Sequence, residues 1–145
     1  MQLSLRPQAG SWADGAYTFV FTTPESVHTC QLALPGELPT TPGPLRELTC
    51  SPALGTLGGA LLNPASACRE ERAANAVSEN CQPLPGQFVL EVQFVGTPAT
   101  LSVHVERSGT VLLDDKQTLR YTEERPNGPG CEPVCRQTRL ALTLP

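Results

Sequence analysis

The stretch QFVLEVQFVGTPATLSVHVE, residues 87–106, decides the fold class of this chain. Every second residue in each half is apolar, and a turn sequence, Gly96–Pro98, separates the two halves. A period of two is that of a β-strand with one buried face. The stretch therefore predicts two amphipathic strands joined by a turn, with these side chains in the core: Phe88, Leu90, Val92, Phe94, Leu101, Val103 and Val105.

Segments on both sides of this stretch have the same character. GAYTFVF at 15–21 alternates in the same way, VHTCQLAL at 27–34 follows it, and RLALTL at 139–144 closes the chain. The 145 residues include 15 prolines and 12 glycines, which suits short strands and stiff turns. Antiparallel strands need no helical crossovers. We predict an all-β fold, a single domain over residues 1–145 that forms an antiparallel β-sandwich of the immunoglobulin-like or transthyretin-like kind.

The alternation of apolar and polar residues stops in the middle of the chain, at about residues 51–85, which predicts an insertion there. SACREERAANAVSENC at 66–81 is the segment richest in good helix formers. We therefore expect a short helix at about Ser66 to Ser78. An irregular loop is the alternative.

The six cysteines form an even set without the ligand spacing of a zinc site. We predict three disulfides, each between neighbours along the chain, because each then closes a short loop. Shared strand faces support the first pair, and the second would hold the inserted segment together. The predicted pairs are Cys30–Cys50, Cys68–Cys81 and Cys131–Cys135.

Disulfides persist in oxidising compartments, so the cysteines predict a secreted, periplasmic or cell-surface protein. The first residues, MQLSLRPQAGSW, contain no apolar signal core, and no stretch approaches the ~18 apolar residues of a membrane span. We expect a mature ectodomain without a transmembrane segment, with any signal peptide or lipid anchor upstream of Met1.

Charge and motifs argue against several classes of function. Ten basic and fourteen acidic residues are spread without a run of either sign, which does not favour nucleic acid or an anionic membrane surface as a partner. Motifs of hydrolases, zinc proteases and phosphate-binding loops do not occur. We therefore expect a protein that is not an enzyme and has no cofactor.

Four residues of metal-binding or acid–base type have simpler interpretations. We interpret His28 and His104 as exposed or capping side chains, because neither is close in sequence to the last cysteine pair. Asp114 and Asp115 would point to opposite faces of a strand, whereas calcium loops bring alternating ligands. A solvated turn is the expected account of these two carboxylates.

The segment PNGPGCEPVCRQ, residues 126–137, contains a Cys-x-x-x-Cys pair with two possible roles. Paired cysteines of low pKa carry thiol exchange or bind copper. However, Glu132 would raise a thiolate pKa, Pro133 lies between the cysteines, and a strand rather than a helix follows. The pair is expected to be a structural disulfide that holds the register of the last strands.

DGAYTF at 14–19, the cysteine of the next strand and above all PNGPGCEPVCRQ resemble secreted lipoprotein ectodomains of unknown function from myxobacteria and related bacteria. The resemblance implies a β-rich domain, often lipid-anchored outside the inner membrane, without an established activity. Two functions stay open. One is a non-catalytic binding or structural module that contacts a protein or glycan at the cell surface. The other is a small periplasmic redox or copper-carrying protein that uses Cys131 and Cys135.

Overall fold

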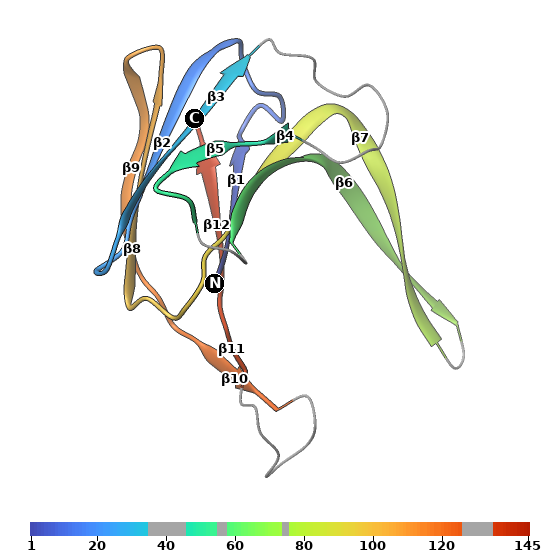
Figure 1. The fold of residues 1–145 in the computed structure, drawn as a ribbon. Helices are drawn as coiled ribbons and strands as arrows, with labels where there is room; N and C mark the ends of the chain where they lie inside the picture. The colour runs from blue at the N-terminus through green and yellow to red at the C-terminus, as the bar shows by residue number, and fades with distance from the viewer. Residues whose placement is uncertain (35–45, 55–57, 74–75, 126–134) are drawn as a thin grey trace.

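The computed structural model describes residues 1–34, 46–54, 58–73, 76–125 and 135–145. Every regular element within these ranges is a β-strand, which confirms the all-β prediction. The strands form two five-stranded sheets and a separate two-stranded hairpin (Figure 1).

The first sheet brings the two ends of the chain together. Its strand order is β12-β1-β7-β6-β4, and all its pairs are antiparallel except β1 with β12. The parallel pair departs from the antiparallel expectation; it is possible because almost the whole chain serves as the long connection that parallel strands need. The strands are β1 (Gln2–Pro7), β4 (Arg46–Glu47), β6 (Gly59–Ala73), β7 (Ala76–Gln93) and β12 (Arg139–Leu144).

The second sheet is antiparallel throughout, in the order β5-β3-β2-β8-β9. Ser108 and Gly109 form the two-residue turn from β8 to β9, and both have positive φ, as tight hairpins require. The strands are β2 (Gly15–Thr22), β3 (Val27–Leu34), β5 (Thr49–Ser51), β8 (Thr100–Arg107) and β9 (Thr110–Thr118).

The core lies between the two sheets, as expected of a sandwich. Phe21 of the second sheet packs edge-to-face on Phe94, the residue that follows β7, with ring centroids 5.6 Å apart. All seven apolar residues that the opening stretch placed inward are buried. Fully buried side chains come from both sheets: Leu3, Leu5, Leu90 and Val92 from the first, and Phe19, Phe21, Leu101, Val103 and Val105 from the second.

The helix expected over Ser66–Ser78 is wrong. Residues 66–73 and 76–78 lie in β6 and β7, which pair with each other as a long hairpin. The irregular alternative is wrong for the same reason. Local helix propensity is a weak preference that cross-strand pairing and the Cys68–Cys81 disulfide outweigh. The expected insertion at 51–85 was also too wide, because residues 59–64 already pair within the first sheet.

Two of the three expected disulfides are confirmed, Cys30–Cys50 and Cys68–Cys81. Cys131 lies outside the described residues, so its pairing with Cys135 stays a prediction. Cys135 is half-buried at the start of β11 (Cys135–Gln137), which pairs with β10 (Thr122–Glu124), and it makes no disulfide with another described cysteine. Among the described residues there is no helix that could cross a membrane.

Candidate functional site

The far ends of β6 and β7 leave the sandwich as a projecting two-stranded hairpin (Figure 1). We call this hairpin the arm and define it as residues 66–73 of β6 and 76–83 of β7. Its strands pair with each other from Ser66 opposite Pro83 to Ala73 opposite Ala76. Among the described residues, neither strand of the arm pairs with a third strand.

A bulge separates the arm from the sheet. Between the pairs Pro64–Phe88 and Ser66–Pro83, one residue of β6 faces the four residues 84–87 of β7. Bulges bend a strand and increase its twist. Gly86 within the bulge has φ 69°, a conformation that favours glycine. The local sequence therefore directs the hairpin away from the body of the sandwich.

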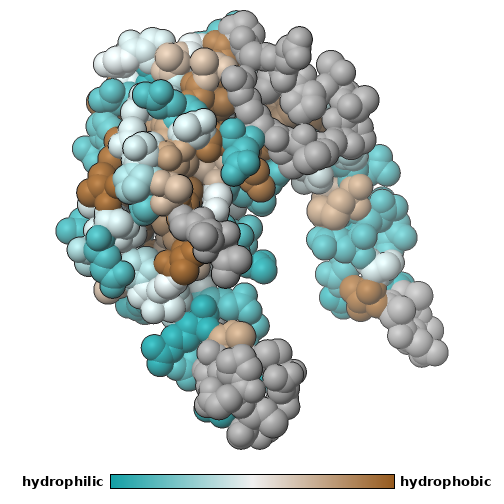
Figure 2. Space-filling model, viewed as in Figure 1, coloured by the Kyte–Doolittle hydropathy of each residue, from teal (hydrophilic) through white to brown (hydrophobic). Residues whose placement is uncertain are grey.

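The arm buries none of its described side chains. Residues 66–72 and 77–83 are all exposed, and Val77 has 66% of its surface accessible. Figure 2 shows that the surface of the arm is largely hydrophilic. The described side chains of the arm therefore add nothing to the apolar core between the sheets.

Strand pairing sorts the arm's side chains onto two faces, because alternate residues point to opposite sides. One face, which we call the disulfide face, carries Cys68 opposite Cys81, Glu70 opposite Glu79, and Arg72 opposite Val77. The other face carries these pairs: Ala67–Gln82, Arg69–Asn80 and Glu71–Ser78.

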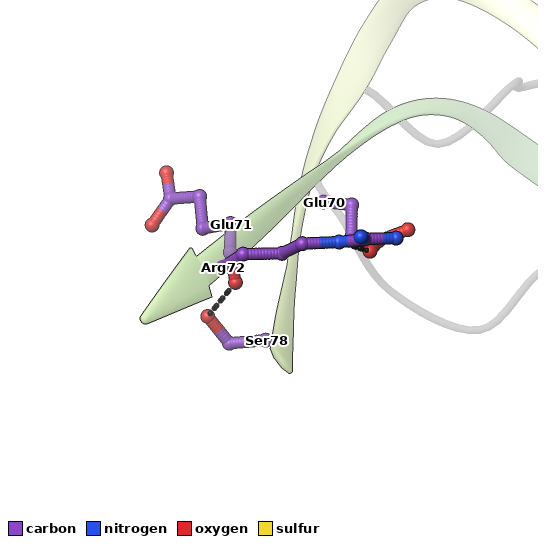
Figure 3. Close-up of polar contacts among 4 residues, drawn as sticks. All are labelled: Glu70, Glu71, Arg72 and Ser78. Carbon is purple, nitrogen blue, oxygen red and sulfur yellow. Dashed lines mark hydrogen bonds and ion pairs between the residues drawn. The ribbon is translucent and has the colours of Figure 1, made fainter. Parts of the chain in front are cut away.

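Two carboxylates oppose each other on the disulfide face. Like charges directly across a strand pair destabilise it. Arg72 offsets part of this repulsion through a hydrogen-bonded ion pair from its Nε to Oε1 of Glu70. Figure 3 shows the Glu71 side chain pointing away from this ion pair, while the Ser78 hydroxyl donates to the Glu71 carbonyl.

Glu79 lies beside the disulfide. A carboxylate oxygen of Glu79 and the Sγ atoms of Cys68 and Cys81 lie within 4.8 Å of one another. Because the two sulfurs are bonded to each other, they are not thiolate ligands for a metal in this state. This arrangement places a negative charge next to an exposed disulfide bond.

The two histidines hold different positions. His28 is hydrogen-bonded through Nε2 to the Ser26 hydroxyl and through Nδ1 to the Pro52 carbonyl, both at 2.9 Å, which agrees with a capping role. His104 lies on the outer face of the second sheet, with its Nε2 3.0 Å from Oε1 of Glu106. Neither histidine contacts a described cysteine through a hydrogen bond or ion pair.

The carboxylates around His104 form a small cluster that the sequence did not indicate. Asp114 lies opposite His104 on β9, with Oδ2 3.7 Å from Nδ1. Hydrogen bonding to Glu106, together with the charges of both carboxylates, raises the pKa of His104 above its ordinary 6.5. Alternation in VHVE could place His104 and Glu106 on one face, but the position of Asp114 depends on the β8–β9 register. Asp115 instead accepts a hydrogen bond from the Gln117 amide. Both aspartates lie within β9, so the solvated turn expected for them is wrong.

Comparison of the chain with models of protein families, with curated proteins and with solved structures finds no match in any of the three. The arm and its disulfide therefore have to be interpreted from their own chemistry.

Proposed function

We propose that this chain is a non-catalytic binding or structural module and that the arm is the element that contacts its partner. The observation that carries this proposal is the exposure of every described side chain on a long, ordered hairpin. The partner would be a protein or a glycan at the cell surface.

The energetics of the arm support a contact role. Ordering the backbone of one residue costs roughly 1–2 kcal/mol, and this cost is usually offset by burial of apolar surface. The described side chains of the arm, residues 66–72 and 77–83, have no such burial, and two-stranded hairpins are marginal by themselves in water. The Cys68–Cys81 cross-link limits the freedom of the unfolded arm. An element kept in shape by a covalent bond rather than by a core is suited to present side chains.

The charges of the arm support a polar partner. Two arginines and three glutamates give it a net charge of −1, with both signs on each face. A nucleic acid would be expected to need a positive surface instead. The same charged side chains protect the open strand edges against pairing with other chains. Contact through side chains is therefore favoured over addition of a partner strand.

The two described disulfides indicate an oxidising, extracytoplasmic compartment. Within that compartment, location at the cell surface and a lipid anchor are part of the proposal. The alternative of a redox or copper-carrying protein uses Cys131 and Cys135, of which Cys131 lies outside the described residues. No observation on the described residues favours it.

Site-specific photo-crosslinking tests the proposed contact. A photoreactive amino acid is placed at Asn80 on the arm or, as a matched control, at Val111 on β9, which is 52% exposed. Each protein is incubated with intact cells of the source organism, irradiated and analysed by mass spectrometry. We expect a discrete adduct from position 80 that is missing from position 111. The same adducts from both positions, or an adduct from position 111 alone, would overturn the proposal that the arm contacts the partner.

A further inference from the structure

The two described disulfides share a backbone geometry but differ in their surroundings. Each joins directly opposed residues of antiparallel strands, with the Cα atoms 4.0 Å apart. Cys30 is fully buried in the core and its partner Cys50 is half-buried, whereas Cys68 and Cys81 are both exposed on the arm. Exchange requires a thiolate to reach one of the sulfur atoms, so access controls its rate.

We propose that Cys68–Cys81 is a thiol-exchange site that accepts neutral or cationic thiols in preference to anionic ones, and that its reduction loosens the arm. The exchange chemistry stands independently of any partner. Its use as a control of partner contact rests on the proposed function of the arm.

The reaction needs two equivalents of thiol, supplied by a small thiol or by a dithiol protein. A thiolate attacks the Sγ atom of Cys68 or Cys81, the bond between the two cysteines breaks, and the departing thiolate takes up a proton. A second thiolate then attacks the mixed disulfide on the sulfur of the first reagent. The net change oxidises two thiols to one disulfide and reduces the cysteine pair by two electrons to two thiols.

Glu79 gives this site its charge preference. Its carboxylate oxygen lies within 4.8 Å of both sulfurs, and Glu70 stands directly opposite it on the same face. Arg72 pairs with Glu70, which leaves Glu79 without a described basic partner in an ion pair. A thiol reagent with a further negative charge is therefore repelled at the point of attack, whereas one with an ammonium group is attracted.

The arm is expected to loosen on reduction because, apart from the disulfide, it is held by the pairing of its own two strands. Its side chains are exposed and its strands pair only with each other among the described residues. Regions with few buried contacts and exposed backbone hydrogen bonds open at low free energy. Loss of the cross-link removes the restraint on that opening, while the body of the sandwich retains its apolar core.

Reduction rates on the purified, oxidised protein test the exchange site. Cysteamine and mercaptoethanesulfonate are added at equal thiolate concentration and low ionic strength, and each disulfide is followed by acid quench, alkylation and peptide mapping. We expect Cys68–Cys81 to be reduced at least about tenfold faster than Cys30–Cys50. Equal rates, or earlier loss of Cys30–Cys50, would overturn the proposal.

Two matched variants test the charge preference. E79Q should lower the ratio of the cysteamine rate to the sulfonate rate by about threefold, because one unit charge near the sulfurs is removed. E71Q removes the same charge from the opposite face of the arm and should change the ratio less. Equal effects of both variants, or no effect of E79Q, would contradict a local role of Glu79.

Hydrogen exchange tests the loosening. After selective reduction and alkylation, the amides of residues 66–83 should exchange faster while those of Leu90 and Val92 stay protected. Unchanged protection of the arm amides would overturn the proposal that reduction loosens the arm. Because all these readouts use the isolated protein, their failure leaves the proposed function standing, whereas a negative crosslinking result overturns that function alone.

Discussion

The indole N–H of Trp12 donates a buried hydrogen bond of 2.9 Å to the carbonyl oxygen of Phe88, 76 residues further along the chain. The Trp12 ring also packs edge-to-face on Tyr17 of β2, with centroids 5.2 Å apart. Phe88 lies on β7 of the first sheet, and Tyr17 belongs to the second. One side chain therefore ties the two layers together close to the base of the arm.

We expect Trp12→Phe to destabilise the fold by about 1–3 kcal/mol, because the buried Phe88 carbonyl loses its donor. Trp12→Ala should cost more, about 3–5 kcal/mol, since the ring packing is also lost. Urea unfolding followed by far-ultraviolet circular dichroism measures both free energies of unfolding. A cost below about 0.5 kcal/mol for Trp12→Phe would show that this hydrogen bond does not stabilise the contact between the sheets.

Deletion of residues 66–83 should leave a folded sandwich. The deletion joins Ala65 to Leu84 and leaves a five-residue loop between Pro64 and Phe88, which already face each other. Since the arm has no described buried side chain, the melting temperature should change by only a few degrees. Calorimetry of the parent and the deletion variant makes the comparison. Failure of the shortened protein to fold would mean that the arm supports the body.

The two disulfides should differ in their effect on global stability. Chain entropy assigns each about 3 kcal/mol, but Cys30–Cys50 joins β5 to β3 within the second sheet while Cys68–Cys81 closes only the arm. C30A/C50A should lower the melting temperature by roughly 10 °C, whereas C68A/C81A should lower it by much less. Equal losses for the two double variants would contradict the independence of the arm from the body.

His104 should titrate above its ordinary pKa of 6.5 in the folded protein. A raised folded-state pKa stabilises the fold fully below the unfolded pKa, and this contribution is lost as the pH rises through the folded value. An NMR titration of the imidazole ring measures the pKa directly. E106Q should move it down toward 6.5, because the hydrogen bond to Glu106 is the largest cause of the increase. A pKa at or below 6.5 in the parent, or one unchanged in E106Q, would refute this account.

The sandwich could be predicted from the sequence because burial of one strand face repeats every two residues. Leu90 and Val103 were placed inward on that pattern alone, and both are fully buried. Two disulfides could also be predicted, because each joins cysteines that are neighbours along the chain: Cys30–Cys50 and Cys68–Cys81.

The arm and the His104 cluster depend on pairing between distant residues, which local patterns do not contain. The helix formers around Glu70 adopt a strand because residues 66–73 pair with residues 76–83 in a cross-linked hairpin. Asp114 reaches His104 only through the β8–β9 register, which includes a bulge after Val105. The Cys68–Cys81 pair was predicted, but as a link across a helix or loop, and no local pattern indicated the β8–β9 register. The strand pairing of the arm and the position of Asp114 therefore required the structure.

Binding to intact cells of the source organism, measured side by side for the parent and the variant that lacks residues 66–83, tests the central claim most directly. Both proteins carry the same fluorescent label, and calorimetry first establishes that both are folded. If the arm carries the contact, the parent should bind saturably and the deletion should weaken binding more than about tenfold. Equal binding by the two folded proteins would contradict the claim and place the contact on the body of the sandwich.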